Sequence, residues 1–427
     1  MIRFTEDNET VAEETFRAIM VGVAINADIS RSMEELAALA EAAGAEVAGL
    51  MTQERERVDR GTYIGTGKAD ELKEACQNME IDTVICNDEL SGIQLRNLEE
   101  ATGVRVIDRT ILILDIFASR AISREGKLQV ELAQLQYRLP RLTGFGKNLS
   151  RLGGGIGTRG PGEKKLETDR RHISRRMDDI KREIKEAAAN RGVQRARRKK
   201  NELPVVAIVG YTNSGKSALM NRILNMFELS DKTVTEKDML FATLDTFQRR
   251  ISLEDNLEFI LVDTVGFVSK LPHSLVKAFH ATLEELVEAD LLLHVVDSSY
   301  EDCEFRVNVV EEVLAELGAA GKDSIMVYNK IDLLDERTAV IDERSGAVRI
   351  SAKTGENIDI LFERIKAQLF SGLRDARLLI PYDRGDVVSW LSDRTSVLSR
   401  EYAEDGVLME AKLSAADFGR LSAFIVK

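Results

Sequence analysis

Short apolar runs alternate with helical patterns over the first part of the chain, residues 1–119. The runs are rich in Val and Ile, which favours strands, whereas the segments between them repeat Leu, Met and Ala at helical spacing. Strands that alternate with helices are typical of a parallel sheet, so we expect a small α/β domain here. The expected strands are Ala18–Ile25, Val47–Met51, Thr83–Cys86 and Val104–Ile107, and the expected helices are Ser32–Ala43, Ala69–Met79 and Leu90–Ala101.

Residues 120–202 carry two long helical stripes of apolar side chains. Two such stripes bury the most apolar surface when they pack on each other, so they predict an antiparallel helical hairpin with these side chains in its core. The two helices would be joined by residues 140–162. The first stripe is Leu128, Leu132, Leu135 and Leu139, and the second is Leu166, Ile173, Met177, Ile180 and Ile184.

Residues 203–371 return to alternating strands and helices. This pattern predicts a doubly wound sheet, whose ligands bind beyond the carboxyl ends of the strands. Residues 372–427 have the pattern of a small α/β module and contain Trp390. We therefore expect a multidomain α/β protein with four parts. The strands expected in the third part are Val205–Val209, Phe259–Asp263, Leu291–Asp297, Ile325–Asn329 and Val348–Ser351.

Length and composition agree with a soluble globular protein. The chain has 427 residues, of which 44% are hydrophobic and 31% are charged, and such a length favours about two to four domains. No apolar run approaches the roughly 20 residues of a membrane span, and the N-terminus lacks the pattern of a secretory signal. Cys76, Cys86 and Cys303 show no metal-type spacing. We therefore expect a reducing compartment and a cytoplasmic protein.

Charge is distributed unevenly along the chain. The formal net charge is −13, yet residues 138–200 contain 20 Lys and Arg against 7 Asp and Glu. A basic segment in an acidic protein is a candidate surface for a polyanion such as nucleic acid.

The most unusual part of this basic segment is the connection 140–162, which holds eight glycines and no acidic residue. Loops of this length are uncommon inside a compact domain and are often functional. Glycines with interspersed arginines let a backbone lie against phosphates and stacked bases. We interpret Arg141, Lys147, Arg151 and Arg159 as RNA contacts. The alternative is a flexible, solvated linker.

A complete phosphate-binding loop follows the strand Val205–Val209. Residues 210–217 are Gly-Tyr-Thr-Asn-Ser-Gly-Lys-Ser, and an apolar-periodic helix follows them. A strand, a glycine loop and a helix in this order form the context that the motif requires. Lys216 would reach the β- and γ-phosphates, and the Ser217 hydroxyl would bind Mg²⁺. The expected nucleotide contacts are Gly210, Tyr211, Thr212, Asn213, Ser214, Gly215, Lys216 and Ser217.

Two further segments complete the expected phosphate site. Asp263 ends a strand and would hold Mg²⁺ through water, and the N–H of Gly266 would meet the γ-phosphate. Thr243, in a polar loop upstream, is the candidate for the hydroxyl that completes the metal shell. The expected Mg²⁺ residues are thus Ser217, Thr243 and Asp263, and the expected catalytic residues are Lys216, Thr243, Gly266 and Asn213.

The segment Asn329–Asp332 identifies the base. The Asp332 carboxylate can accept hydrogen bonds from N1–H and the 2-amino group of guanine, and adenine offers neither donor. Asn329 would tie this loop to the phosphate loop, and the Lys330 stem would lie over the purine. The next strand ends in a loop that would place N–H groups near guanine O6. The expected base-side residues are Asn329, Lys330, Asp332, Ser351, Ala352 and Lys353. Four motifs in this order predict a GTPase with GTP as its substrate.

The residue that follows Gly266 bears on the rate of hydrolysis. Small GTPases place a glutamine there to orient water, but this chain has Phe267. We therefore expect slow intrinsic turnover, with the missing group supplied by a partner or an ion. Asn213 is a candidate, because its carbonyl oxygen could bind a K⁺ that bridges the phosphates. Alternatively, Asn213 only braces the backbone of the loop.

Together these motifs resemble the HflX family of ribosome-associated GTPases. The resemblance implies a nucleotide-binding-like N-terminal domain and a helical hairpin, followed by a GTPase domain. It also implies that the protein binds the large (50S) ribosomal subunit, is stimulated by it, and splits stalled or idle ribosomes. The loop 140–162 would then reach ribosomal RNA near the peptidyl-transferase region, and Thr243 would be a firmer Mg²⁺ ligand. The matching segments are 126–140, 153–163, 166–171, 210–217, 241–245 and 263–267.

The chain departs from the family pattern at residues 245–247. They are Asp-Thr-Phe, where the family usually has Asp-Pro-Thr. The resemblance therefore does not extend to the proline that stiffens the first switch loop.

Two other functions fit the same residues. The chain could time the assembly of the large subunit through the same RNA contacts, or act as a GTP-dependent adaptor that docks on a protein through its acidic N-terminal domain. We expect a monomer whose partners are the large subunit and its rRNA, with no DNA partner and no membrane span.

Overall fold

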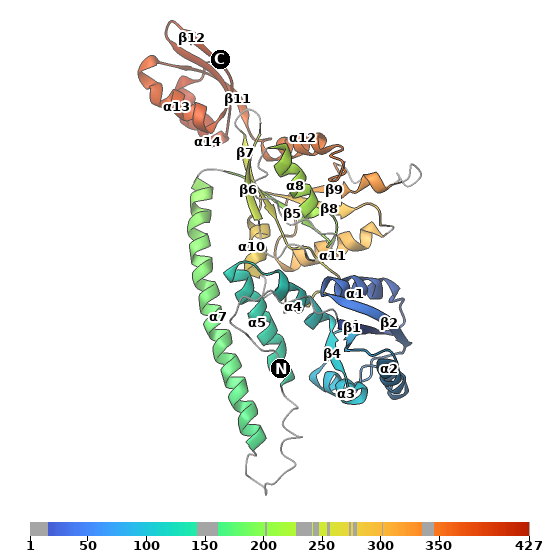
Figure 1. The fold of residues 1–427 in the computed structure, drawn as a ribbon. Helices are drawn as coiled ribbons and strands as arrows, with labels where there is room; N and C mark the ends of the chain where they lie inside the picture. The colour runs from blue at the N-terminus through green and yellow to red at the C-terminus, as the bar shows by residue number, and fades with distance from the viewer. Residues whose placement is uncertain are drawn as a thin grey trace. The chain divides into compact units, whose positions relative to one another are not determined.

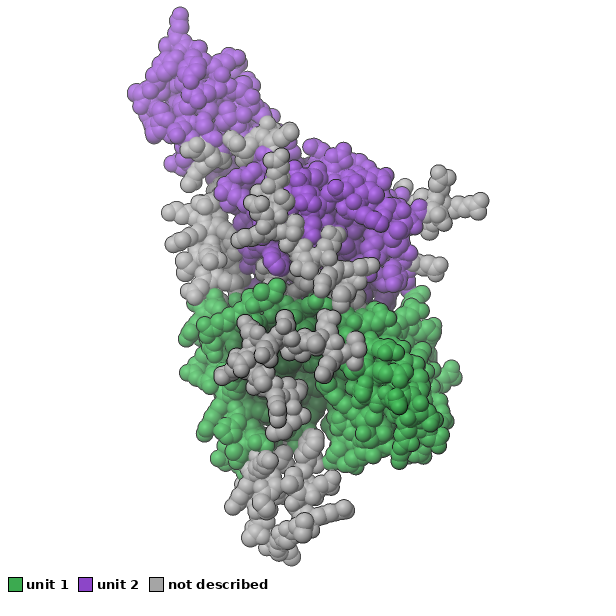
Figure 2. Space-filling view, in the orientation of Figure 1, with its two compact units in different colours: residues 1–189, 239–244, 269–279 green, residues 190–238, 245–268, 280–427 purple. Residues whose placement is uncertain are grey.

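The structure falls into two compact units (Figure 2). One unit contains residues 1–189, 239–244 and 269–279, and the other contains residues 190–238, 245–268 and 280–427. Each unit has its own sheet and its own apolar core. The structure is a computed structural model, and it describes residues 16–142, 161–200, 203–227, 241, 247–253, 257–272, 275, 280–300, 302–334 and 346–426.

The first unit is built on a four-stranded sheet in the order β2-β1-β3-β4, in which all three pairings are parallel. This confirms the parallel α/β arrangement that the sequence predicted. Figure 1 labels β1, β2 and β4 of this sheet. The strands are β1 (Phe16–Ala24), β2 (Ala45–Glu54), β3 (Thr83–Cys86) and β4 (Arg105–Asp108). The helices are α1 (Ser30–Ala42), α2 (Thr66–Asn78), α3 (Gly92–Thr102) and α4 (Arg109–Arg120).

Local side chains explain where two of these helices begin. At the start of α3, the Ser91 hydroxyl accepts from the Gln94 backbone N–H at 3.3 Å, and the Gln94 side-chain amide oxygen accepts from the Ser91 N–H at 2.9 Å. This reciprocal pair is a capping box, which satisfies two N–H groups at the helix start. At the start of α4, Asp108 accepts from the Ile111 N–H at 2.9 Å.

The helical hairpin is formed by α5 (Arg124–Arg141) and α7 (Pro161–Lys200) (Figure 1). Arg176 of α7 binds Glu131 of α5 through Nε at 2.7 Å and Nη2 at 2.8 Å, a two-point geometry that also fixes the register of the helices. The predicted packing of the two stripes is confirmed for most of their members. Those that meet are Leu128, Leu132, Leu135, Met177, Ile180 and Ile184.

The first unit also contains residues that follow Phe267 in the sequence. Arg109 is 2% exposed, and its Nη2 donates to the Ser269 hydroxyl at 3.1 Å and to Glu35. The Ser269 hydroxyl in turn donates to Glu35, and Lys270 pairs with Asp88 at 2.6 Å. Residues from the third part of the chain therefore complete a polar cluster at the carboxyl edge of the first sheet.

The second unit contains a six-stranded sheet in the order β10-β9-β8-β5-β7-β6. Only β6 runs antiparallel to its neighbour, at one edge. The chain turns to opposite sides of β5, so the carboxyl end of β5 is the switch point at which such sheets bind ligands. The strands are β5 (Val205–Gly210), β6 (Phe247–Ser252), β7 (Glu258–Asp263), β8 (Leu291–Asp297), β9 (Ser324–Asn329) and β10 (Val348–Arg349).

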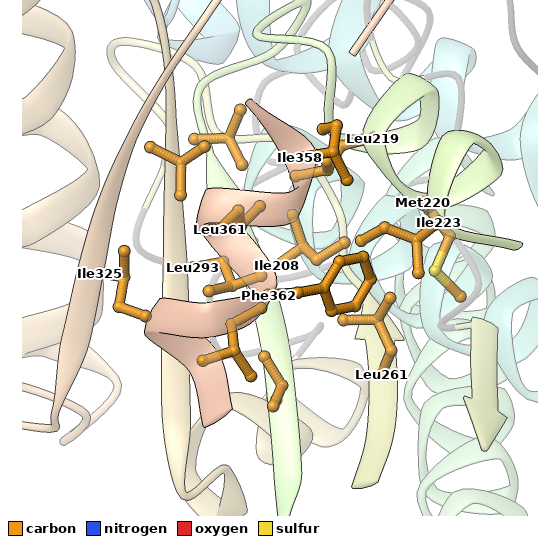
Figure 3. Close-up of a cluster of buried hydrophobic side chains, with 14 of the residues drawn as sticks. Ile208, Leu219, Met220, Ile223, Leu261, Leu293, Ile325, Ile358, Leu361 and Phe362 are labelled. Atoms are coloured by element: carbon orange, nitrogen blue, oxygen red, sulfur yellow. The ribbon is translucent and has the colours of Figure 1, made fainter. Parts of the chain in front are cut away.

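The core of this sheet is formed with α8 (Lys216–Met226) and α12 (Ile358–Leu369) (Figure 3). The other helices are α10 (His280–Glu288), α11 (Cys303–Glu316) and the short η3 (Ile331–Leu333). Close packing of this kind leaves little freedom to the strand ends, which therefore hold their loops in place. The buried side chains include Ile208, Leu219, Met220, Ile223, Leu261, Leu293, Ile325, Ile358, Leu361 and Phe362.

The C-terminal part has a three-stranded antiparallel sheet in the order β11-β13-β12. Leu378, Met409 and Leu391 form its core, against which Trp390 packs. Among the described residues, no helix combines the length and the apolar character that a bilayer crossing requires. The elements of this part are β11 (Arg374–Ile380), η4 (Tyr382–Arg384), α13 (Gly385–Arg394), β12 (Ser396–Ala403), β13 (Gly406–Leu413), α14 (Ala415–Arg420) and η5 (Ser422–Phe424).

Candidate functional site

The glycine-rich loop 210–217 connects β5 to α8, as the sequence predicted. Gly215 stands immediately before the helix with φ of 90°, a conformation that disfavours other residues. A Cβ atom on Gly215 would also collide with the amide nitrogen of Asn329. Because the loop ends at a helix N-terminus, its backbone N–H groups can point together towards a bound anion.

The interior of this loop is polar and buried. Lys216 is 7% exposed, and its ammonium donates to the carbonyl oxygens of Gly210 at 3.1 Å and Tyr211 at 2.7 Å. Burial lowers the pKa of Lys216 to about 8, although the nearby Asp263 carboxylate opposes this shift. Among the described residues, the buried hydroxyl oxygens of Thr212 and Ser214 have no hydrogen-bond partner. Such groups are costly unless a ligand satisfies them, and a phosphate would do so.

Two of the three residues expected to bind Mg²⁺ lie together. The Ser217 hydroxyl donates to the Asp263 carboxylate at 3.0 Å, and Asp263 is fully buried at the end of β7. A hydroxyl and a carboxylate at this separation are oxygen donors of the kind that Mg²⁺ prefers, so these residues fit the ion. Thr243 lies outside the described residues, and its role stays a prediction.

The segment after Asp263 packs directly on the phosphate loop. The Thr212 N–H donates to the Phe267 carbonyl at 2.7 Å, and the Phe267 N–H donates to the Gly210 carbonyl at 3.2 Å. A Cβ atom on Gly266 would lie 2.8 Å from Thr212 Cγ2 and 2.9 Å from Lys216 Nζ, so only glycine allows this approach. Phe267 is 2% exposed, and its side chain offers no group that could orient water.

The base-side loops meet the phosphate loop through Asn329. Its amide nitrogen donates to the Ser214 carbonyl at 2.9 Å, and its amide oxygen accepts from the Ala352 N–H at 2.9 Å. This confirms the expected link between the loops. The Ser351 hydroxyl donates to Asp332 at 2.6 Å. The structure therefore brings the loops after β5, β7, β9 and β10 to one edge of the sheet.

Models of protein families match four consecutive stretches of the chain. They are GTP-binding GTPase N-terminal at residues 30–118, GTP-binding GTPase Middle Region at 120–198, 50S ribosome-binding GTPase at 205–330 and HflX C-terminal domain at 337–423. GTPase HflX of Caldanaerobacter subterraneus subsp. tengcongensis is 49% identical over 418 residues, which cover 98% of this chain and 96% of that relative. The chain belongs to the GTPase HflX family.

A second curated relative agrees with this membership. GTPase HflX of Escherichia coli (strain K12) is 39% identical over 411 residues, which cover 95% of each chain. Among solved structures, a GTP-binding protein from the hyperthermophilic archaeon Sulfolobus solfataricus in complex with GDP is 25% identical, with a TM-score of 0.44 over 83% of this chain and 99% of that chain. As a member of the HflX family, the chain is a P-loop GTP hydrolase.

Two residues of this HflX GTPase domain that contact the predicted motifs were not predicted from the sequence. Asp297 is 2% exposed at the end of β8 and pairs with Lys330 at 2.8 Å, so it holds the loop after β9. The sequence signal for Asp297 was a carboxylate at the end of a mostly apolar strand. Arg222 of α8 contacts the loop after β10, and nothing in its sequence context marked it.

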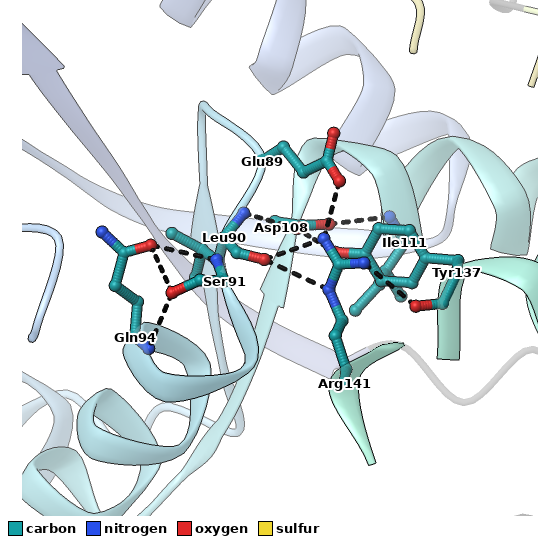
Figure 4. Close-up of polar contacts among 8 residues, drawn as sticks. All are labelled: Glu89, Leu90, Ser91, Gln94, Asp108, Ile111, Tyr137 and Arg141. Atoms are coloured by element: carbon teal, nitrogen blue, oxygen red, sulfur yellow. Dashed lines mark hydrogen bonds and ion pairs between the residues drawn. The ribbon is translucent and has the colours of Figure 1, made fainter. Parts of the chain in front are cut away.

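Of the four residues expected to contact RNA in this HflX chain, only Arg141 is described. Its guanidinium donates to the Leu90 carbonyl at 2.8 and 3.1 Å, to the Tyr137 carbonyl at 3.0 Å and to Glu89 at 2.7 Å (Figure 4). It also lies 3.3 Å from the centre of the Tyr137 ring. Arg141 therefore joins the end of α5 to the turn before α3. Its contact with RNA stays a prediction.

A buried carboxylate supports the same junction. The Asp108 side chain accepts from the Leu90 N–H at 2.8 Å and from the Tyr137 hydroxyl (Figure 4). Burial raises the pKa of Asp108, although these hydrogen bonds oppose the shift. Lys147, Arg151 and Arg159 lie outside the described residues.

The lowered pKa of Lys216 predicts proton uptake when this HflX protein binds a nucleotide. With a pKa of about 8, roughly half of the Lys216 side chains are neutral at pH 8 in the free protein, and a phosphate favours the charged form. GDP binding at pH 8 should therefore take up about half a proton, and affinity should fall as pH rises through 8. Calorimetry in buffers of different ionisation enthalpy measures this uptake.

The matched control for this measurement is Lys216→Arg, because a guanidinium stays charged at these pH values. Uptake should vanish in that variant. Equal protonation of the wild-type protein before and after binding at pH 8 would contradict the expected shift.

Proposed function

We propose that this chain is a GTPase that binds the large (50S) ribosomal subunit, is stimulated by it, and splits stalled or idle ribosomes. One observation carries the proposal. Four loops converge at one edge of the six-stranded sheet, within a chain whose residues 205–330 match a family described as a 50S ribosome-binding GTPase.

In this proposal, one group of described residues would bind the guanine base and another would bind the phosphates. Asp332 would accept from N1–H and the 2-amino group of guanine, and Asn329 would keep the base-side loops at a constant distance from the phosphate loop. The Lys330 stem, fixed by Asp297, would cover the purine. The rigid link through Asn329 would thus make phosphate binding depend on the correct base.

On the phosphate side, the N–H groups of residues 210–217 would surround the β-phosphate. Lys216 would exchange its two carbonyl acceptors for phosphate oxygens, and the Gly266 N–H would meet the γ-phosphate. Ser217 and Asp263, with Thr243, would hold Mg²⁺. When bound there, Mg²⁺ would supply positive charge that offsets the charge of the phosphates.

The contact with ribosomal RNA is proposed for the loop 140–162 and the start of α7. Lys147, Arg151 and Arg159 supply positive charge in this loop, and Arg170 and Arg175 are exposed further along α7. Basic side chains along one segment can follow a phosphate backbone. Contact with rRNA would thereby control when the γ-phosphate is released.

Cosedimentation with separated ribosomal subunits tests this function. The protein bound to a non-hydrolysable GTP analogue should sediment with large subunits and not with small ones, and GDP should weaken the complex. Large subunits should also accelerate GTP turnover, and the stimulation should fall steeply with added salt. A protein that neither sediments with large subunits nor is accelerated by them would contradict the proposal.

Small GTPases have a water-orienting glutamine at the position of Phe267. A bound K⁺ is proposed to compensate in part for the absence of this glutamine. Asn213 has φ of 58°, a left-handed conformation that asparagine tolerates better than most residues. Its side-chain oxygen would hold K⁺ beside the phosphates. GTP turnover should then be roughly tenfold faster in K⁺ than in Na⁺, as expected for about 1.4 kcal/mol of transition-state stabilisation.

The control for the ion is Asn213→Ala, which should turn over GTP equally in both salts. Equal rates of the wild-type protein in K⁺ and Na⁺ would leave Asn213 with a role in bracing the loop only.

A further inference from the structure

Arg222 of α8 reaches across to the loop that follows β10. Its Nε donates to the Ala352 carbonyl at 3.2 Å, and its Nη2 donates to the Lys353 carbonyl at 2.8 Å. Two consecutive carbonyl groups of the loop therefore point towards a single side chain. The planar guanidinium suits this task, because its donors are held in a rigid fork.

The orientation of the carbonyl groups determines the orientation of the N–H groups. The described residues contain no cis peptide bond, and in a planar trans peptide the C=O and the N–H point in opposite directions. The Ala352 carbonyl and the Lys353 N–H belong to the same peptide. Since the carbonyl points towards Arg222, the Lys353 N–H points away from it.

The neighbouring N–H groups already have acceptors within the chain. The Ala352 N–H donates to the Asn329 amide oxygen at 2.9 Å, and the Thr354 N–H donates to the Ser351 hydroxyl at 3.1 Å. Among the hydrogen bonds of the described residues, the Lys353 N–H has no acceptor. It is therefore the donor that this loop can offer to a ligand.

The same loop is tied to Asp332, the residue that would accept from N1–H and the 2-amino group of guanine. The Ser351 hydroxyl donates to Asp332 at 2.6 Å, so Asp332 and the Lys353 N–H are held by one short segment. On guanine, N1–H and O6 are adjacent, with a donor next to an acceptor. A carboxylate beside an N–H group matches this pair, whereas adenine presents an amino group where guanine has O6.

We propose that Arg222 is a positioning residue for base specificity, which turns the Lys353 N–H towards guanine O6. This inference rests on the guanine site proposed above. Arg222 touches neither the base nor the phosphates in this scheme, and it acts only by fixing the two carbonyl groups. Its loss should let the Lys353 peptide rotate, so that the O6 contact weakens while the contacts of Asp332 persist.

Binding of three diphosphates to the full chain separates this role from a general loss of folding. GDP and inosine diphosphate both carry O6, whereas 6-thioguanosine diphosphate replaces it with sulfur, a weak acceptor. Arg222→Leu should weaken GDP and inosine diphosphate about tenfold each, the size of one net hydrogen bond. The same variant should weaken 6-thioguanosine diphosphate less than about threefold.

Two variants complete the calorimetric experiment. Arg222→Lys retains a single donor nitrogen in place of the fork, so its affinities should lie between those of the wild-type protein and Arg222→Leu. Asn225→Ala, on the exposed side of α8, should bind all three nucleotides normally. Equal weakening of all three by Arg222→Leu, or unchanged GDP affinity, would overturn the role of Arg222. A wild-type protein that binds ADP as tightly as GDP would instead overturn the guanine site itself.

Discussion

An Asp332→Asn variant is expected to lose most of its affinity for GTP and to bind xanthosine triphosphate instead. Asp332 would accept two hydrogen bonds from guanine, and an asparagine amide would face the guanine donors with donors of its own. Two charge-assisted hydrogen bonds correspond to roughly 3–4 kcal/mol, or about 100- to 1000-fold in affinity. Xanthine has a carbonyl oxygen in place of the 2-amino group, so it can accept from the new amide.

The Ser351 contact makes this substitution a clean test. The Ser351 hydroxyl donates to one oxygen of Asp332 at 2.6 Å, and an asparagine oxygen can accept the same bond, so the loop should keep its place. Equilibrium binding of GTP and xanthosine triphosphate measures the exchange of preference. Asp359→Asn, on the exposed face of α12, is the matched control. Retained preference for GTP in Asp332→Asn would show that another group reads the base.

The second large effect is expected when Arg151→Ala and Arg159→Ala are combined. Each arginine is proposed to contact an RNA phosphate, so the double variant should bind large subunits about 10- to 100-fold more weakly at low salt. The slope of log affinity against log salt should also decrease by about two. The affinity for GTP should stay the same, because neither residue belongs to the nucleotide site of the proposal.

The control for this variant removes equal charge elsewhere. Arg57→Ala with Arg60→Ala lowers the net charge by the same amount at exposed positions of the first unit, and it should leave subunit binding nearly unchanged. Cosedimentation over a range of salt concentrations provides the affinity and the slope. Loss of GTP binding in the loop variant would place these arginines in the nucleotide site rather than at the RNA.

The sheet of the GTPase domain was predictable because its signals are local. Val205–Val209 is a continuous apolar run, and Leu291–Asp297 is apolar except for His294 and the final Asp297. A parallel strand buried on both faces can be recognised from such a run without knowledge of its partner strands. Each motif follows such a strand directly. Since the carboxyl ends of parallel strands share one edge, the order of motifs along the chain was enough to predict that they meet.

Arg141 differs, because its contacts are not local in the sequence. Composition grouped it with Lys147, Arg151 and Arg159, because charge along a segment is all that a sequence reveals at that position. In the structure its guanidinium contacts Glu89, Leu90 and Tyr137. Leu90 and Glu89 lie 51 and 52 residues from Arg141 in the sequence. No local sequence pattern therefore predicts that they contact it.

Ser269 illustrates the same point. It follows Phe267 in the sequence, yet its hydroxyl bonds Arg109 and Glu35, which lie far earlier in the chain. Arg109, Glu35 and Ser269 form this cluster through bonds across 74 and 160 residues. Burial of a guanidinium requires several acceptors at once, and only the folded chain can provide them.

The order of residues alone was sufficient for the α/β class, the helical hairpin and the family, because periodicity and strand-end motifs are short-range properties. Folding decided which polar groups have partners within the chain and which are left for a ligand. Two examples are partners within the chain: Arg222 binds the Ala352 and Lys353 carbonyls, and Asp297 binds Lys330. Hydrogen bonds depend on distance and direction in space, so these pairs could not be inferred before the elements were brought together.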